Sequence, residues 1–484
     1  MIGRNKEKGW VLVAAIVFSF ILILLGIGFF SLSHHEFGLV GDRNAYAQAL
    51  YVSEAGIERT LFNLRKDFVN DPDPYDPPSP WADGYINGIA APYNTANFYP
   101  LPYPTTSLGE GSYDVKLKNI DDDEIWVKST GTVKGIERTV QVKAKMTDIS
   151  SWNNAITAGR GAFGGAISGN AKIAGSVHIL GEGLSPSDKA IDMGGTAGIR
   201  NNYDGIPNEL KVRIPWVETL EATLRVKHGE VWLSGTATVG ESGVPVDGVY
   251  VTDGYGGNKG AANVYSNNGT ANGYDLGDAM AFPRLNDPYE YEGYSYSKYQ
   301  DYLKANALVI SNPDDLAKFA SITPNSSFNY SSAKGSVSMD GSGNLTISGI
   351  VYLDGGNLKM NIAGSEKTIT YSGSGSFLVT GNAEIYVNLL TPSFPENAIS
   401  VMTPGQTTIG DAANIDVMGI FYAEDKITCN KQTNIAGTIV SSYFDMGSNV
   451  PAIYQVPSLI RKLPKGTIAG TPVWKCKTSG WKES

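Results

Sequence analysis

The chain has 484 residues, of which 42% are hydrophobic, so two or three folded domains are expected and wholesale disorder is excluded. The formal net charge of −10 argues against a nucleic-acid partner, because binding to a phosphate backbone needs a basic face. Many of the 56 glycines have β-branched neighbours, a pattern that indicates short strands joined by tight turns.

An uncharged, apolar run extends from Trp10 to Phe30 and follows the basic residues Arg4, Lys6 and Lys8. A helix over this run is just long enough to cross the hydrocarbon core of a bilayer. The basic residues on its N-terminal side predict that the short N-terminus stays in the cytoplasm and that the rest of the chain lies outside. A cleaved secretory signal would have a shorter apolar core.

The helical pattern continues beyond the membrane, because no proline occurs before Pro72. We therefore predict one helix over residues 10–68, with residues 10–30 as its transmembrane part. The second half carries an apolar stripe that would need a partner surface. The residues of this stripe are Phe37, Val40, Ala47, Leu50, Ile57, Leu61 and Leu64.

Two features of this region resemble PilX-type minor pilins of type IV pilus systems. One is the pair Lys8-Gly9 before the apolar run, and the other is the later stretch ALYVSEAGIERTL. The resemblance covers residues 6–66. It implies that a prepilin peptidase cuts between Gly9 and Trp10 and methylates the new amino terminus, so that residues 1–9 are a basic leader. It also implies an inner-membrane precursor, whose partners are other minor and major pilins and the inner-membrane assembly platform.

The chain departs from the family pattern at Ala14. Major pilins carry a glutamate at this position, five residues into the mature chain, which is thought to pair with the buried amine of a neighbouring subunit. An unpaired charge in an apolar filament core is costly. The missing carboxylate therefore fits a tip or initiating subunit, as in the GspK-like pseudopilins, better than a repeating one.

A small sheet is expected over residues 69–148. The segment NDPDPYDPPSPW ends the helix, and its Asp71, Asp73 and Asp76 could collect Ca²⁺, although a solvated linker is the favoured reading because the EF-hand glycine and glutamate are absent. No other cofactor is expected. Alternating apolar and polar residues on both sides of a hairpin tip at residues 121–124 predict three antiparallel strands. Packed against the helix, these strands would form a pilin-like α+β unit.

Residues 149–484 form a Gly-rich β domain. Short alternating strands, with inward pairs such as Leu345/Ile347 and Ile385/Val387, follow one another at irregular intervals. This favours a parallel β-helix or a related stacked-strand body, with an antiparallel sandwich as the alternative. The expected fold class is therefore α+β: a long N-terminal transmembrane and amphipathic helix, a small antiparallel pilin-like sheet and a large all-β domain.

Residues 245–304 are expected to be an insertion rich in Tyr, Asn and Gly. Its exposed aromatics could bind glycans, surfaces or partner proteins, and the candidates are Tyr289, Tyr291, Tyr294 and Tyr296. The favoured alternative is a loop whose rings pack back onto the β body, with Tyr299 and Tyr302 on a short helix.

The two cysteines, Cys429 and Cys476, both lie near the C-terminus. In a cytosolic enzyme the two thiols could stay reduced and buried, whereas in an exported chain such a pair more often forms one disulfide, which we expect here. No Cys/His cluster occurs, and a structural zinc site is not expected.

Motifs of known enzyme classes are absent: the sequence has no HExxH, GxSxG, P-loop or dinucleotide fingerprint. We expect no enzymatic activity. The predicted function is a minor pilin or pilin-like subunit that initiates or caps a type IV pilus-type filament and displays the β domain at the surface for adhesion or interaction. The alternatives are a GspK-like pseudopilin of type II secretion and a membrane-anchored β-helix protein active on polysaccharides, whose acids would come from Asp340, Asp354, Asp411 and Asp416.

Overall fold

The computed structural model describes residues 7–71, 79–103, 107–163, 167–291, 293–411, 414–447, 450–470 and 473–483. The chain divides into two compact units. The first, which we call the helix–sheet unit, contains the residues up to Asp148 together with Trp474–Ser484. The second, the stacked-strand unit, is Ile149–Val473. The predicted β domain over 149–484 is therefore wrong at its C-terminal end, because the last strand belongs to the helix–sheet unit.

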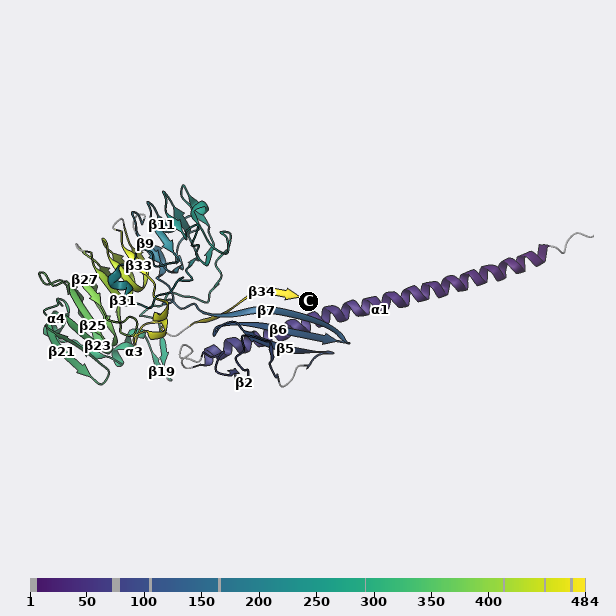
Figure 1. Ribbon diagram of the computed structural model, residues 1–484, viewed down its shortest axis with the longest axis horizontal. Helices are drawn as coiled ribbons and strands as arrows, with labels where there is room; N and C mark the ends of the chain where they lie inside the picture. Colours follow the sequence, from purple (N-terminus) through teal and green to yellow (C-terminus); the bar gives the residue numbers. More distant parts are fainter. Residues whose placement is uncertain are drawn as a thin grey trace, which may run out of the picture. The chain divides into compact units, whose positions relative to one another are not determined.

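Helix α1 (Glu7–Asn70) has 64 residues and is about 96 Å long at the standard rise. Its bounds agree closely with the predicted helix over 10–68. Figure 1 shows α1 as one continuous helix that extends well beyond the small sheet. Burial in this unit begins at Ala45, so the sheet covers only the second half of the helix.

The sheet of this unit has six strands, and its main path is β3-β5-β6-β7-β34, with β4 paired to β5. The bounds are β3 (Tyr99–Pro100), β4 (Ser107–Leu108), β5 (Gly111–Asn119), β6 (Glu124–Val133), β7 (Ile136–Asp148) and β34 (Trp474–Glu483); a separate hairpin has β1 (Tyr85–Ile86) and β2 (Ile89–Ala90). The three predicted antiparallel strands are confirmed as β5, β6 and β7. The predicted hairpin tip at residues 121–124 is the connection between β5 and β6.

Strand β34 completes the sheet by pairing antiparallel with β7, with Trp474 opposite Asp148. The chain thus leaves the sheet at the end of β7 and returns to it directly beside that point. The whole stacked-strand unit is inserted between two neighbouring strands of one small sheet.

The helix packs on the sheet through small residues, which allow the two backbones to come close. A Cβ on Gly131 of β6 would overlap the carbonyl oxygen of Ala49 and the amide nitrogen of Ser53. On the helix side, a Cβ on Gly56 would overlap the hydroxyl of Ser129. Only glycine fits at these two points of contact.

The predicted apolar stripe of α1 is only partly correct. Ile57 and Leu64 are buried, whereas Phe37, Val40 and Ala47 are exposed. Phe37 and Val40 precede the covered part of the helix. Within that part, the face that meets the sheet is instead lined by residues that include several small ones, namely Ala45, Ala49, Val52, Ser53, Gly56, Ile57, Thr60, Leu64 and Phe68.

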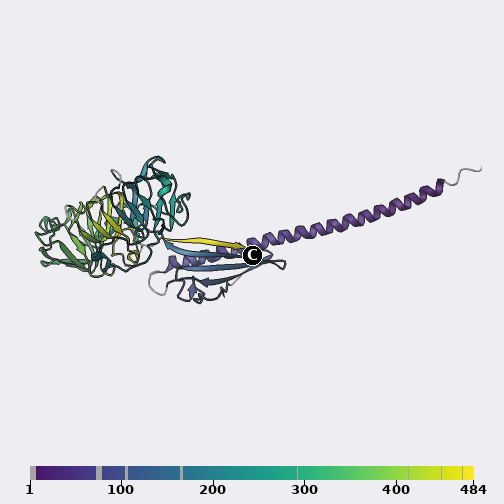
Figure 2. The ribbon, with the colours of Figure 1, turned by 45° about the horizontal axis from the view of Figure 1, so that its top comes forward.

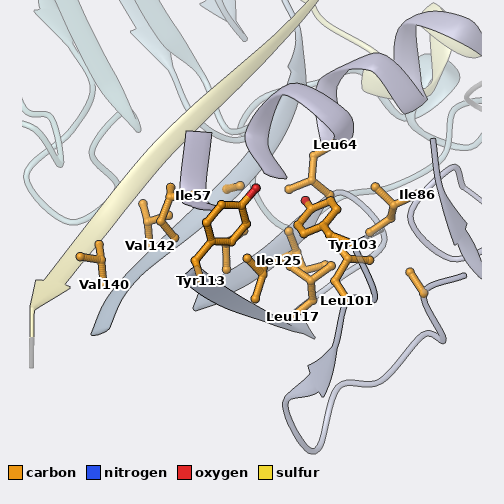
Figure 3. Close-up of a cluster of buried hydrophobic side chains, with 14 of the residues drawn as sticks. Ile57, Leu64, Ile86, Leu101, Tyr103, Tyr113, Leu117, Ile125, Val140 and Val142 are labelled. Carbon is orange, nitrogen blue, oxygen red and sulfur yellow. The ribbon is translucent and has the colours of Figure 1, made fainter. Parts of the chain in front are cut away.

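A hydrophobic core fills the space between α1 and the inner face of the sheet. Figure 3 shows Ile57 and Leu64 of the helix in one cluster with side chains of the strands, such as Val142 next to Ile57. At the end of the helix, the ring of Phe68 lies 5.2 Å from that of Trp81 and 4.7 Å from that of Trp474, centroid to centroid. The returning strand β34 therefore contributes to the same core as the N-terminal helix.

The stacked-strand unit is built mainly from short parallel strands that lie over one another as rungs (Figure 2). Its elements in chain order are β8 (Ile156–Ala162), β9 (Lys172–Ala174), β10 (Val177–Ile179), β11 (Lys189–Met193), β12 (Gly198–Arg200), α2 (Asn208–Lys211), β13 (Thr223–Val226), β14 (Glu230–Leu233), β15 (Thr238–Val239), β16 (Gly248–Val251), β17 (Tyr255–Gly256), η1 (Gly260–Asn263), β18 (Tyr289–Tyr291), β19 (Tyr294–Tyr296), α3 (Tyr299–Ala305), β20 (Leu308–Ile310), α4 (Pro313–Phe319), β21 (Ser327–Ser332), β22 (Gly335–Asp340), β23 (Asn344–Leu353), β24 (Leu358–Asn361), β25 (Thr368–Ser372), β26 (Ser374–Val379), β27 (Ala383–Tyr386), β28 (Asn388–Leu390), β29 (Ala398–Thr403), β30 (Gln406–Ile409), β31 (Asp416–Cys429), β32 (Asn434–Asp445), β33 (Ala452–Tyr454) and η2 (Pro457–Lys462).

The first strand of the stack in chain order, β8, has strands of the stack on both sides. Strand β8 pairs in parallel with β10, which continues to β13 and β16. The chain re-enters at β20 and returns through β23, β26, β29 and β31 to β32, which pairs with the other side of β8. Among the named strands described in this unit, antiparallel pairing is confined to β18–β19 and β21–β22–β23, so the sandwich alternative is wrong. The inward pairs predicted from the alternation, such as Leu345/Ile347 and Ile385/Val387, are buried.

The close approach of α1 to β6 generates a direct test. Replacing Gly131 with Ala should lower the free energy of unfolding of the helix–sheet unit by about 2 kcal/mol, because the new methyl group meets backbone atoms that cannot rotate away. Hydrogen-exchange mass spectrometry should show faster exchange in α1 from residue 45 onward, with the stacked-strand unit unchanged. Thr132→Ala, on the next residue of β6, is the matched control. Equal protection in both variants would contradict the proposed close packing.

Candidate assembly surface

The first part of α1 presents apolar side chains on all sides. From Trp10 to Leu32 its large hydrophobic residues are exposed, and Trp10 itself has 79% of its surface accessible. The most apolar window of this helix has a mean hydropathy of 3.0, and none of it is buried. This length and composition suit a membrane-spanning helix. The same surface would have to be covered by other apolar helices if the protein left the bilayer.

The residues that the sequence marks for processing lie at the start of this helix. Gly9 and Trp10 are both within α1, in its first turn after Glu7. Ala14 follows four residues after Trp10, so the two side chains lie on the same face of the helix, one turn apart. The methyl side chain of Ala14 has no group that could neutralise an amine, whether of this chain or of a neighbouring subunit.

The second part of α1 is covered by the sheet on one side only. Its uncovered side carries further exposed hydrophobic residues, of which Tyr51 and Phe62 have 68% and 64% of their surfaces accessible. Together with Phe37, Leu39 and Val40 they prolong the apolar surface of the first part. We call the exposed side of α1 from Trp10 to Phe62 the assembly surface; beyond Val40 it also carries polar residues such as Arg43, Gln48 and Glu58.

Charged residues flank the covered side of α1 and fasten it to the sheet. Arg59 donates to the hydroxyl of Tyr113 at 2.9 Å, and its guanidinium lies 4.2 Å from the centroid of the Tyr103 ring. Arg138 of β7 lies 3.3 Å from the centroid of the Tyr46 ring. These contacts fix how α1 is rotated about its own axis, and therefore which side of the helix remains uncovered.

The predicted Tyr-rich insertion over 245–304 starts later than expected, because Gly248–Val251 forms β16 within the stack. The segment after it packs on the same unit through buried side chains such as Phe282 and Leu285. Phe282 stacks on Tyr422 with ring centroids 6.0 Å apart, and the Tyr422 hydroxyl donates to the carbonyl of Pro283 at 2.7 Å. The segment thus packs on strands of the returning half of the stack.

The tyrosine group forms a cluster around Tyr302 rather than a row of free rings. Tyr289, Tyr291 and Tyr296 have ring centroids 4.8, 5.3 and 5.4 Å from that of Tyr302. Tyr299 and Tyr302 are buried on α3, as the alternative interpretation predicted. Of the four candidate binding residues, Tyr294 is the most exposed, at 69%. The structure therefore leaves at most the outer edge of this cluster for contact with a partner.

The expected disulfide is wrong, because both cysteines are free thiols in the structure. Cys429 ends β31 inside the stacked-strand unit, where burial raises its thiol pKa to about 12. Cys476 lies on β34 and packs against the core of the helix–sheet unit, where burial raises its pKa to about 11. Each side chain is held in the core of a different unit. The late position of both cysteines in the sequence did not reveal this separation.

The Ca²⁺ site considered from the sequence cannot be placed, because Asp73 and Asp76 lie outside the described residues, while Asp71 follows the end of α1. Near that end, burial raises the pKa of Asp67 to about 7, with smaller contributions from Asp83 and Asp71. A carboxyl group that is half protonated near neutral pH is a poor ligand for a hard cation. Among the described residues, no group of three or more His, Cys, Asp or Glu side chains could hold a metal ion.

Three of the four acids considered for catalysis have separate structural contacts, and the fourth, Asp411, is exposed. Asp340 caps its own turn by accepting from the amides of Ser342 and Asn344, Asp354 pairs with Lys304, and Asp416 accepts from Asn434. His178 is 2% exposed, its Nε2 lies 2.7 Å from the Tyr274 hydroxyl, and burial lowers its pKa to about 3. His178 therefore holds the segment after β16 in place and stays neutral at physiological pH.

Comparison with solved structures shows a similarity to the competence-associated pilin ComZ from Thermus thermophilus. The two chains are 20% identical, the TM-score is 0.55, and the match covers 91% of this chain and 97% of that chain. No protein-family model matches the sequence, and no curated protein matches it. At this identity the similarity concerns the fold. The chain has a pilin-like α+β fold with a large strand-rich body, as the sequence predicted.

The cysteine assignment gives the second testable outcome. When the protein is denatured without reductant and alkylated, both Cys429 and Cys476 should be modified and the mass should increase by two alkyl groups. In the folded protein, labelling should be slow at both thiols because burial keeps them protonated. An unmodified denatured chain that takes up two groups only after reduction would show that the disulfide forms after all.

Proposed function

We propose that this chain is a minor pilin-like subunit of a type IV pilus-type filament, which initiates or caps the filament and displays the stacked-strand unit at the surface for adhesion or interaction. It would be made as a single-pass precursor in the inner membrane, with its C-terminus outside. Other minor and major pilins, the prepilin peptidase and the assembly platform would be its partners.

The assembly surface is the observation that carries this proposal. A simple membrane anchor would need only the 10–30 segment, but α1 continues without a break and keeps exposed apolar residues as far as Phe62. Leaving such a surface in water is unfavourable by roughly 25 cal/mol for each Å². Other helices of the same kind would cover it. This is the arrangement that a filament core of packed helices provides.

The similarity to a competence-associated pilin supports the same interpretation at the level of the fold. The resemblance of residues 6–66 to PilX-type minor pilins supports it independently from the sequence. On this proposal, the N-terminal helix changes its environment from lipid to protein.

The position in the filament is proposed from Ala14. In a shaft, each subunit's amine would be buried against the carboxylate of a neighbour. A subunit that lacks this carboxylate leaves the neighbouring amine unpaired in an apolar environment, where an unpaired charge costs several kcal/mol. That cost is avoided at the end of the filament where no further amine has to be neutralised.

N-terminal analysis of the membrane-extracted protein tests the pilin assignment. When the chain is expressed with its prepilin peptidase, mass spectrometry should find a chain that begins at methylated Trp10. Without the peptidase, the chain should remain uncut, because the bond after Gly9 is not a substrate for signal peptidase. Gly9→Val should block the cut, since a branched side chain next to the bond obstructs the enzyme, whereas Gly3→Val in the leader is the control. An uncut chain in the presence of the peptidase would overturn the proposal.

The Ala14→Glu variant tests the position in the filament. Restoring the carboxylate should let the subunit enter the shaft, and its copy number per filament should rise about tenfold, as expected for one charge-assisted pair. Quantitative mass spectrometry of sheared filaments and immunogold labelling would measure this. Ala14→Gln, which has the shape but not the charge, should stay at the wild-type level. Wild-type protein distributed along the shaft would contradict the terminal position.

A further inference from the structure

The sheet of the helix–sheet unit has one face that α1 does not cover. Side chains alternate between the two faces of a strand. The buried residues of β5, β6 and β7 point toward α1, and the residues between them point outward. The register places Lys118, Trp126 and Lys143 next to one another across β5, β6 and β7. In the adjacent row of side chains on the same face, Lys116, Lys128 and Gln141 are neighbours. Lys482 of β34 lies opposite Gln141 in this row.

This outer face is basic although the chain as a whole is acidic. Its lysines Lys116, Lys118, Lys128, Lys143 and Lys482 come from four strands. Two of them have carboxylate partners: Lys116 lies 3.7 Å from Asp114, and Lys143 lies 2.6 Å from Glu124. Glu137 lies at one end of the face. Among the described residues, Lys118, Lys128 and Lys482 have no carboxylate within ion-pair distance, so a net positive charge remains at the centre of the sheet.

A tryptophan lies in the middle of these lysines. The Nζ atoms of Lys143 and Lys482 are 5.7 and 5.6 Å from the centroid of the Trp126 ring. Gly480 of β34 brings the backbone against the edge of this ring, where a Cβ would be in tight contact. A second ring, Phe98, has the Nζ of Lys128 5.9 Å from its centroid. The face therefore combines two aromatic rings with nearby lysines, two at Trp126 and one at Phe98.

The side chains on this face are regularly spaced. Outward residues repeat at about 7 Å along each strand and at about 5 Å between strands. Regularly spaced ammonium groups around flat rings suit a flexible chain that carries repeated negative charges and flat bases. An antiparallel sheet with aromatic residues at its centre is also a platform on which unpaired bases stack.

We propose that the outer face of the sheet, formed by Lys116, Lys118, Trp126, Lys128, Lys143 and Lys482, binds single-stranded nucleic acid. The bases would stack on Trp126 and Phe98, and the phosphates would lie between the lysines. The net charge of −10 does not describe this face, since it averages over both units.

Other anionic partners fit this face less well. A membrane surface would not lie opposite this face, because the face points away from α1, and α1 is the helix that is proposed to cross the membrane. A duplex keeps its bases inside the stack and offers none to Trp126. An acidic protein or an anionic glycan would use the lysines but would have no base to stack on the two rings.

The binding test uses the full chain in detergent micelles and a fluorescently labelled oligothymidylate of about 20 nucleotides, a length that covers one or two such sites. Fluorescence anisotropy is measured from low to moderate salt. Binding should weaken as salt increases, with a slope near −0.7 for each lysine–phosphate contact. The competitors are duplex DNA of the same length, heparin and anionic phospholipid vesicles, and each should compete at least about tenfold more weakly than unlabelled oligothymidylate.

Two sets of variants separate the proposal from general attraction of anions. The triple substitution Lys118→Gln, Lys128→Gln, Lys482→Gln should reduce the salt slope by about 2 and the affinity by about tenfold or more. The control triple Lys259→Gln, Lys298→Gln, Lys465→Gln changes the net charge equally, at exposed positions of the other unit, and should bind as the wild type does. Trp126→Ala should lower the affinity by about tenfold, and Trp126→Phe should restore most of it. Circular dichroism confirms that each variant is folded.

Three results would overturn the inference. One is equal loss of binding in both lysine triples, and another is unchanged binding by folded Trp126→Ala. The third is competition by heparin, duplex or vesicles as strong as that by the single strand. None of these results bears on cleavage after Gly9, so the pilin assignment would be decided separately.

Discussion

The close contact between α1 and β6 is the constraint on which the rest of the helix–sheet unit depends. A helix that crosses a membrane has little reason to settle on one side of a small sheet, because its apolar residues lie all round it. Here Gly131 and Gly56 determine which side of α1 meets the sheet, because backbone and small side chains can touch at these points, where any larger residue would clash. The helix can approach the sheet closely along one line only. This line fixes the rotation of α1 and leaves the opposite side of the helix uncovered.

The same unit also determines how the large β body is attached. The body is not a C-terminal extension, because the chain returns after it and pairs β34 with β7. Trp474 contacts Phe68, so the last strand helps to bury the end of the first helix. A truncation anywhere in the body would therefore remove a strand and a core residue from the helix–sheet unit.

Much of this architecture could be predicted from the sequence, because the period of apolar residues in a helix and their alternation in a strand indicate which side chains are buried. The alternation around residues 113–142 gave β5 to β7, and pairs such as Ile385/Val387 gave the inward positions of the stack. The prediction was wrong where burial does not depend on large apolar residues. The helix face that meets the sheet was missed because Ala, Ser and Gly carry little hydrophobic signal. Strand β34 was missed because it is mostly polar, and only the edge of β7 makes it a strand.

The candidate site residues also differ in whether they could be predicted from the sequence. Gly9, Trp10 and Ala14 were singled out through the resemblance of residues 6–66 to PilX-type minor pilins, and their roles are proposals. The separation of Cys429 from Cys476 depends on contacts between distant segments and could not be predicted. The inward packing of the tyrosine rings was expected as the favoured alternative, but the central place of Tyr302 in the cluster was not. The basic face was hidden for a related reason: its lysines come from β5, β6, β7 and β34, and only the register of the sheet brings them together.

The two surfaces that we connect with function both result from the packing of α1 on the inner face of the sheet. Burying one side of α1 against the inner face of the sheet leaves two surfaces uncovered, the far side of the helix and the outer face of the sheet. They lie on opposite sides of the shared core and differ in chemistry, since one is apolar and the other is basic with aromatic rings. A subunit that uses its helix to join other helices must therefore keep its basic face outward. Assembly through α1 and binding through the sheet can then occur together without competing for the same surface.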